Sequence, residues 1–185
     1  AGYAGSRVSR NRAFARKVAA SGACVLLAGR DMADLKAMAE DCRLRGARAA
    51  EALAFDARDP SGFPALIDRM EREEGALNAA VFVGSMPAQA EIDADPSLID
   101  GVVTDSHTGP ARFLQMLAPL IEARGQGTVV GVCSVAGDRG RIGNYVYGSA
   151  KAGFATYLSG LRNRLPRAGA HVVTVKPGFV DTAMT

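Results

Sequence analysis

Residues 129–137 read VVGVCSVAG, and residues 144–151 read NYVYGSAK. The apolar run at the start of the first stretch predicts a buried strand that ends at Ser134. The second stretch places Tyr147 and Lys151 four positions apart, so their side chains share one face if the segment is helical. We therefore expect a hydroxyl, a phenol and an ammonium group to reach one pocket.

These three groups suit the transfer of a proton to or from an oxygen atom. A free tyrosine has a pKa of about 10 and is a poor acid or base at neutral pH. A fixed positive charge nearby favours the phenolate and lowers that pKa, and a serine hydroxyl can hydrogen-bond a substrate carbonyl. A cofactor would then carry the hydride. The alternative is a buried tyrosine and a snorkelling lysine on an amphipathic helix.

The rest of the chain alternates between short apolar runs and amphipathic stretches, a pattern typical of βαβ units and a parallel sheet. Strands are predicted at residues 23–29, 49–55, 77–84, 127–134 and 170–178. Helices are predicted at residues 9–21, 31–45 with Asp31 as the N-cap, 60–74, 96–123 with an interruption near Gly109, and 145–165. The fold class is therefore α/β.

Composition excludes several classes of function. The 185 residues carry a net charge of +3, too small to argue for nucleic acid, and no apolar run is long enough to cross a membrane. The three cysteines fit no metal spacing, so we predict no metal site and a reducing, cytoplasmic location. A basic cluster near the start is interpreted as a solvated helix face: Arg7, Arg10, Arg12, Arg16 and Lys17.

A strand before Ser134, a helix around Tyr147 and a final strand ending in Lys176-Pro177-Gly178 together resemble the short-chain dehydrogenase/reductase family, from about Gly5 to Thr182. The resemblance implies a Rossmann-like, doubly wound parallel sheet in a three-layer sandwich. It also implies an NAD(P)-dependent oxidoreductase that interconverts a ketone and a secondary alcohol.

The same resemblance assigns catalytic roles. Tyr147 would be the general acid/base, Lys151 would lower its pKa and hold the nicotinamide ribose, and Ser134 would orient the substrate. Ser106 stands where many family members carry an asparagine that holds a water in a proton relay.

The first strand of such a sheet is central and buried. Only Ala1-Gly2-Tyr3-Ala4 precede Gly5 in this chain. We therefore expect a single domain over residues 1–185 that is truncated at both ends, lacking part of the first strand and the C-terminal substrate segment. We expect the isolated chain to be marginally stable or prone to aggregation.

The nucleotide-binding loop departs from the family pattern T-G-x-x-x-G-x-G. Gly5 matches the first glycine, whereas Ser9 and Asn11 stand at the second and third, and Arg10 replaces an apolar residue. Ser9 can cap the helix and Arg10 can contact a phosphate, but a side chain at position 11 can crowd the helix against the sheet.

Arg30 follows the second strand of the family's fold. An acidic residue there accepts from the 2′-hydroxyl of NAD, whereas an arginine suits the 2′-phosphate of NADP. We predict NADP, with NAD as the alternative cofactor and a surface arginine as the alternative role. The resemblance adds further cofactor contacts: Asp56 (alternatively an N-cap), Gly84, Pro177, Gly178 and Thr182.

The loop between Ser134 and Tyr147 would border the substrate. Arg139 and Arg141 can recognise a phosphate or carboxylate there, or they can form surface ion pairs. The stretches SVAGDRGR, NYVYGSAKAG, GLRNRL and VKPGFVDTAMT are similar to bacterial members related to the decaprenylphosphoryl-2-keto-pentose reductases. Those enzymes reduce a keto-sugar on a polyprenyl phosphate.

Two hypotheses follow. The first is an NADP-dependent oxidoreductase that acts on a small-molecule carbonyl or alcohol and forms a homodimer or homotetramer through the Tyr147 helix. The second is a catalytically silent scaffold or partner subunit, which Ser9, Asn11 and Ser106 favour. Outside these motifs, a lone His107 is read as structural. Asp93, Asp95 and Asp100 are read as turn and cap residues rather than metal ligands.

Overall fold

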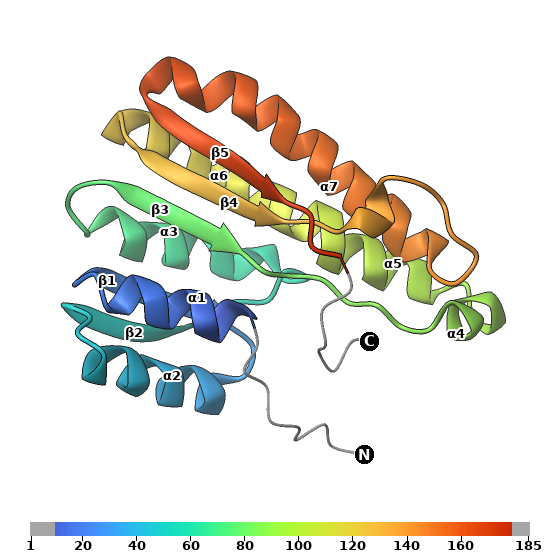
Figure 1. Ribbon diagram of the computed structural model, residues 1–185, viewed down its shortest axis with the longest axis horizontal. Coiled ribbons are helices and arrows are strands. Elements are labelled where there is room, and N and C mark those ends of the chain that lie inside the picture. The colour runs from blue at the N-terminus through green and yellow to red at the C-terminus, as the bar shows by residue number, and fades with distance from the viewer. Residues whose placement is uncertain (1–9, 179–185) are drawn as a thin grey trace. The chain divides into compact units, whose positions relative to one another are not determined.

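A computed structural model describes residues 10–178 of the chain (Figure 1). Its internal contacts divide the chain into two units, each of which is described by itself. The first unit is represented by residues 10–56, and the second unit is formed by residues 57–178.

Two parallel strands and two helices build the first unit. In chain order they are α1 (Arg10–Ala19), β1 (Cys24–Gly29), α2 (Met32–Leu44) and β2 (Ala49–Ala54). The strands pair in register from Cys24 opposite Ala49 to Gly29 opposite Ala54. The Asp31 carboxylate accepts from the backbone N–H of Asp34 at 3.0 Å, which confirms the predicted N-cap of α2.

The core of the first unit consists mainly of small side chains: Ala15, Ala19, Val25, Leu27, Met38, Ala39, Cys42 and Ala50. Two arginines of α1 bind acids of α2: Arg12 pairs with Asp34, and Arg16 pairs with Asp41 at 2.7 Å. The reading of the basic cluster as a purely solvated face is therefore wrong for Arg12 and Arg16. Their charges are used to hold one helix against another.

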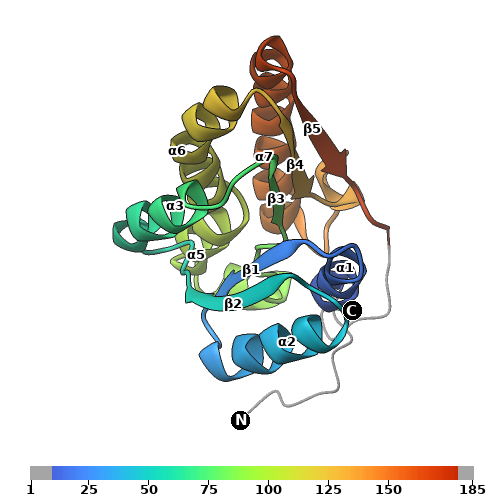
Figure 2. The same ribbon diagram turned by 90° about the vertical axis from the view of Figure 1, so that its left-hand side faces the viewer.

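The second unit contains a three-stranded parallel sheet in the order β3-β4-β5. The strands point the same way in Figure 1, and Figure 2 shows α6 and α7 along one face of the sheet. Its elements are the 3₁₀ turn η1 (Pro60–Gly62), α3 (Phe63–Glu71), β3 (Leu77–Val81), α4 (Gln89–Ala94), α5 (Leu98–Val103), the π-helical segment η2 (Thr104–Thr108), α6 (Gly109–Arg124), β4 (Gly127–Val132), the 3₁₀ turn η3 (Val135–Gly137), α7 (Tyr145–Arg164), the 3₁₀ turn η4 (Leu165–Ala168) and β5 (Ala170–Val175).

Large side chains fill the core of the second unit. Fully buried members include Phe63, Leu114, Leu117, Ile121, Phe154, Leu158 and Leu165. A Cβ atom added to Gly131 of β4 would lie 2.2 Å from a methyl carbon of Leu158 on α7. The glycine therefore lets α7 lie directly on the sheet, which determines how close the side chains of α7 come to the strand ends.

The predicted helix at residues 96–123 with an interruption near Gly109 is confirmed, with a π-helical segment as the interruption. The structure contains α5, a π-helical segment and α6, and a further helix, α4, that was not predicted. A Cβ on Gly109 would lie 2.3 Å from the carbonyl oxygen of Ala57, so the chain passes too close there for a larger residue. The six residues of α4 are too few for a helical period to be recognised in the sequence.

Candidate active site

Lys151 is the most firmly positioned charged residue of the candidate site. Its side chain lies on α7 with the residue 3% exposed, and its Nζ donates to the carbonyl oxygens of Val83 at 2.8 Å and Val132 at 3.1 Å. Val132 is the last residue of β4, and Val83 lies two residues beyond the end of the neighbouring strand β3. Burying an ammonium is costly unless it is hydrogen-bonded, and the two bonds fix its position. The snorkelling alternative is therefore wrong for Lys151.

Tyr147 lies one helical turn before Lys151. The Nζ atom of Lys151 is 5.9 Å from the centroid of the Tyr147 ring. The half-buried ring packs against the cluster formed by Ile92, Val102, Val146 and Ala150. The structure thus brings the phenol and the ammonium to one face of α7.

Ser134 follows β4 and begins the turn η3. Its Oγ accepts from the backbone N–H of Ala136 at 3.1 Å. Within the described range, the hydroxyl hydrogen of Ser134 has no recorded acceptor, so it can donate to a substrate oxygen. The loop is held in place by two neighbouring backbone bonds, in which Cys133 donates to Val175 at 2.8 Å and Val135 donates to Pro177 at 3.3 Å.

Two glycines bring the Ser134 loop against the Tyr147 helix. A Cβ on Gly148 would lie 2.6 Å from the carbonyl oxygen of Ala136, and one on Gly137 would lie 2.8 Å from the backbone nitrogen of Ala152. The close approach of loop and helix therefore needs both glycines. Sequence reasoning missed these residues, although they flank the motif in SVAG and YGSAK.

Gly84 and Ser106 meet at Lys151. Gly84 is exposed and has a φ of 146°, a conformation that side chains rarely adopt. A Cβ there would lie 3.1 Å from both Lys151 Nζ and Ser106 Oγ. Ser106 itself is fully buried in the π-helical segment, with its Oγ 3.5 Å from the carbonyl oxygen of Ser85. The structure brings these separately predicted residues together.

An ion pair that the sequence did not suggest holds the π-helical segment. Asp105 precedes Ser106, and its two carboxylate oxygens accept hydrogen bonds from Nε and Nη2 of Arg58, each at 2.7 Å. The Asp105 side chain is 9% exposed. This bidentate ion pair with a largely buried carboxylate restricts the motion of the segment that carries Ser106.

In the second unit, Pro177 and Gly178 follow β5 after one intervening residue. Pro177 is half-buried and Gly178 is exposed. In the first unit, Arg30 directly follows β1 and is exposed, and Asp56 lies just beyond β2. Since the two strands are parallel, both residues lie at the same edge of that sheet. The predictions for Gly5, Ser9 and Thr182, and for the side chain of Arg10, fall outside the described residues.

Asn11 lies in the first turn of α1. Its side chain is exposed, and its Oδ1 accepts from the backbone N–H of Arg12 at 3.2 Å. Its side chain is therefore directed away from the core of the first unit, and the effect of position 11 on cofactor binding stays a prediction.

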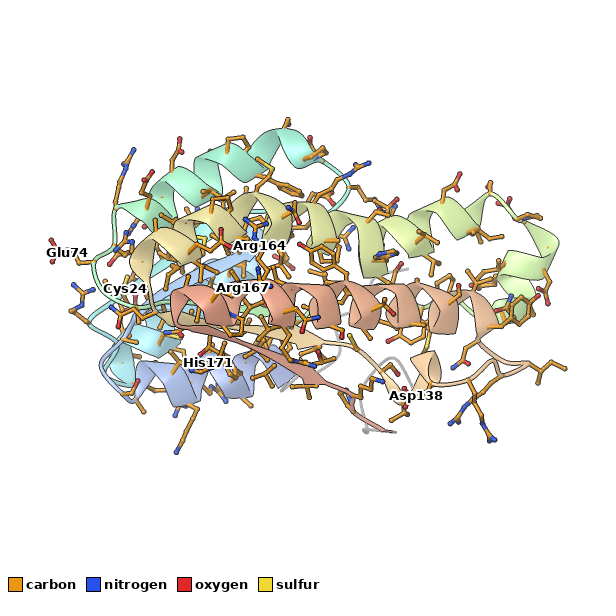
Figure 3. The ribbon with its side chains drawn as sticks, turned by 90° about the horizontal axis from the view of Figure 1, so that it is seen from above. Cys24, Glu74, Asp138, Arg164, Arg167 and His171 are labelled. Carbon is orange, nitrogen blue, oxygen red and sulfur yellow. The ribbon has the colours of Figure 1, made fainter. Side chains whose placement is uncertain are left out.

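The loop between Ser134 and Tyr147 contains polar groups that have no hydrogen-bond partner among the residues that the structure describes. Across residues 10–178, neither Arg139 nor Arg141 forms an ion pair, and the buried Arg141 Nε and Asn144 Oδ1 have no hydrogen-bond partner. Asp138 instead binds Lys176 at 2.5 Å, at the opposite end of α7 from Arg164 and Arg167 (Figure 3). Among the described residues, neither arginine therefore has the surface ion pair of the alternative interpretation. Ile142 between them is 95% exposed.

The remaining polar candidates have structural roles. Asp95 accepts from the backbone N–H and hydroxyl of Ser97, which confirms the turn chemistry. Asp93 differs, because its Oδ1 accepts from the Tyr145 hydroxyl at 2.6 Å and from Gln89 at 3.0 Å. These bonds lower the pKa of Asp93, and the carboxylate raises the pKa of Tyr145. No potential metal-binding group occurs in the part of the chain that the structure describes.

His107 follows Ser106 in the same segment. A Cβ on Gly153 of α7 would lie 2.8 Å from its Nδ1. The imidazole therefore packs on the α7 backbone, as expected for a structural histidine.

The matching family model is that of the short chain dehydrogenases, and it covers residues 11–185. An uncharacterized oxidoreductase of Mycobacterium tuberculosis is 35% identical over 182 residues, which are 98% of this chain and 73% of that protein. The chain therefore belongs to the short-chain dehydrogenase/reductase family of oxidoreductases.

Solved structures share the fold. A short-chain dehydrogenase from Sphingobium yanoikuyae in complex with NADPH matches with a TM-score of 0.75 and 25% identity, over 92% of this chain and 67% of that one. The bulky-bulky ketone specific alcohol dehydrogenase from Comamonas testosteroni matches with a TM-score of 0.82 and 22% identity, over 93% and 69%. These likenesses confirm the Rossmann-like α/β fold. Within residues 10–178, no helix is long and apolar enough to span a membrane.

Proposed function

We propose that the protein is an NADP-dependent oxidoreductase that interconverts a ketone and a secondary alcohol. The observation that carries the proposal is the buried ammonium of Lys151, held by two strand-end carbonyls at 5.9 Å from the ring of Tyr147. A positive charge fixed in this way is a means of tuning a phenol for proton transfer near neutral pH.

Each residue of the site has a role in this proposal. NADPH would supply the hydride to the carbonyl carbon. Tyr147 would give its proton to the carbonyl oxygen, and Lys151 would stabilise the phenolate that remains. The Ser134 hydroxyl would donate to the same oxygen. Ser106 would hold a water that returns the proton to Tyr147, and the bond of Asp105 to Arg58 keeps its segment in place.

The preference for NADP rests on Arg30. Its exposed guanidinium directly follows β1, the strand end at which the family recognises the adenine ribose, and an arginine suits a 2′-phosphate. The NADPH complex of the Sphingobium enzyme is consistent with this choice. Asp56, at the same edge of the β1–β2 sheet, is the proposed adenine contact.

The substrate side favours an anionic carbonyl compound with an apolar part. Arg139, the unsatisfied Nε of Arg141 and the exposed Ile142 lie on the loop between Ser134 and Tyr147. A keto-sugar on a polyprenyl phosphate combines these features and is the specific substrate class that we propose. The active form would be a cytoplasmic homodimer or homotetramer that pairs through α7.

The decisive test is a titration of the protein with NADPH and NADH, followed by nicotinamide fluorescence. We expect saturable binding that is tighter for NADPH, and an Arg30→Ala variant should lose about tenfold in NADPH affinity while NADH binding is unchanged. Lys36→Ala removes an equal exposed charge from α2 and serves as the control. Failure to bind either cofactor would contradict the proposal and favour the silent scaffold.

A further inference from the structure

One face of α4 is directed at the start of α7. Gln89, Ile92 and Asp93 stand at positions i, i+3 and i+4, which share a side of a helix. Ile92 is 2% exposed and belongs to the buried cluster that contains Val146 and Ala150 of α7, against which Tyr147 packs. The apolar part of this face therefore supports the helical turn that carries the phenol.

The polar part of the same face forms a chain of hydrogen bonds. Gln89 is 6% exposed, and its Oε1 accepts from the backbone N–H of Val146 at 3.3 Å. Its Nε2 donates to Asp93 Oδ1 at 3.0 Å, and the Tyr145 hydroxyl donates to the same oxygen at 2.6 Å. Tyr145 and Val146 are the two residues immediately before Tyr147.

The first turn of α7 needs this support. Its N-cap is Asn144, whose side chain makes no capping hydrogen bond to any described residue. The first backbone N–H groups of a helix have no partner inside the helix, and a side chain usually satisfies them. Gln89, some fifty-seven positions away in the chain, takes over this task for Val146.

The segment that contains α4 also reaches Lys151. It begins two residues beyond β3 with Val83, whose carbonyl accepts from Lys151 Nζ at 2.8 Å, and with Gly84, which leaves room for that ammonium. Residues 83–93 therefore contact both partners of the acid–base pair, Lys151 at one end and the Tyr147 turn at the other.

We propose that Gln89, together with Asp93 and Tyr145, is a positioning residue that fixes the first turn of α7 and thereby the placement of Tyr147 relative to Lys151. The proposal rests on the proposed function, because it takes Tyr147 as the acid–base group. Loosening this turn would let the phenol move away from the ammonium, whose own position is fixed by Val83 and Val132.

The test compares two tyrosine contacts on the same helix. Gln89→Ala and Tyr145→Phe remove the proposed contacts. Gln115→Ala and Tyr157→Phe are matched controls, because the Tyr157 hydroxyl donates to Gln115 at 3.2 Å about three turns further along α7. With tyrosine labelled at Cζ, carbon NMR follows the ionisation of each of the four tyrosines without a cofactor or substrate.

For Gln89→Ala and Tyr145→Phe we expect the Tyr147 titration midpoint to move to higher pH. We expect kcat to fall by about tenfold, with KM for NADPH within about twofold of the parent value, since only proton transfer is affected. The control variants should change neither quantity. The double variant Q89E/D93N exchanges amide and carboxylate, so that the bond between positions 89 and 93 keeps a donor opposite an acceptor and the Tyr145 oxygen becomes the acceptor of the second amide N–H. It should recover most of the loss.

The outcomes separate the two proposals. A variant with a lower melting temperature, an unchanged Tyr147 titration midpoint and an unchanged kcat would overturn the inference. If Gln89→Ala does not fold, Tyr145→Phe provides the same test, because Tyr145 is exposed and its substitution should be tolerated. A parent protein in which Tyr147 ionises no earlier than Tyr157 would contradict the acid–base assignment itself, and the inference with it. A shifted midpoint in a protein that reduces no tested ketone would support the inference and leave the substrate proposal wrong.

Discussion

The two units of the chain differ in how deeply they bury the residues that we assign to function. In the second unit, Lys151 is 3% exposed and its ammonium is bound by two backbone carbonyls. In the first unit, Arg30 is exposed at the end of β1, beside a core made mostly of small side chains. An acid–base group must be held within a fraction of an ångström, whereas a charge that selects a cofactor can act from an exposed side chain. We therefore expect catalysis and cofactor preference to respond to different substitutions.

The largest effect should come from removing the phenol in the second unit. Tyr147→Phe should lower kcat by at least about a hundredfold, because no other group replaces the proton donor. Steady-state kinetics with a ketone substrate, alongside cofactor titration and a thermal melt, would measure this. Cofactor affinity and melting temperature should stay near the parent values. If the variant keeps most of its activity, Tyr147 is not the acid–base group.

The two cores should respond unequally to truncation. Phe63→Ala, at a fully buried position that meets the Phe113 ring edge-on at 5.6 Å, should cost about 3–5 kcal/mol of unfolding free energy. Leu27→Ala in the first unit, where the residue is 8% exposed, should cost about 2–3 kcal/mol.

Denaturant unfolding, combined with hydrogen exchange to report on each unit, would measure both losses. Equal costs would contradict the distinction between the cores.

Reversing the charge at the edge of the first unit should change cofactor preference and leave the chemistry intact. Arg30→Glu should weaken NADPH binding by more than tenfold, because a carboxylate repels the 2′-phosphate, and should strengthen NADH binding through the ribose hydroxyl. Comparing kcat/KM for the two cofactors would measure the switch. A variant in which kcat with saturating cofactor also collapses would show that the two functions are not separable.

The smallest effect concerns acid stability. The hydrogen bond from Arg16 lowers the pKa of Asp41 in the first unit, and that from Arg164 lowers the pKa of Glu122 in the second. A carboxyl with a lowered folded-state pKa stabilises the protein above its ordinary value, 3.8 for Asp41 and 4.5 for Glu122, and this contribution is lost as pH falls through the folded-state pKa.

Asp41→Asn and Glu122→Gln should each flatten the decline in melting temperature below about pH 4.5, by a small amount because both groups are near the surface. Melts at pH 7, 4.5 and 3 would measure this. A variant that remains as acid-sensitive as the parent would show that its ion pair contributes nothing.

Much of the arrangement could be predicted from local patterns. Alternating apolar and amphipathic stretches predicted the parallel strands and most helices, because a strand buried on both faces reads as an apolar run. The spacing of Ser134, Tyr147 and Lys151 predicted their common location, and the pattern after β1 placed Arg30 at a strand end. Helix boundaries were less accurate around residues 82–109, where the chain forms two short helices and a π-helical segment.

The sequence by itself determined the fold class, the family and the types of chemical group at the site, since these depend on residue identity and on periods of two and 3.6 residues. The tertiary structure alone decided which groups hold the site together: the carbonyls of Val83 and Val132 at Lys151, Arg58 at Asp105, and Gln89 at the first turn of α7. These partners are backbone atoms or residues distant in the chain. They become neighbours only when the strands and helices pack, and no local pattern encodes a contact between segments whose separation is set by packing.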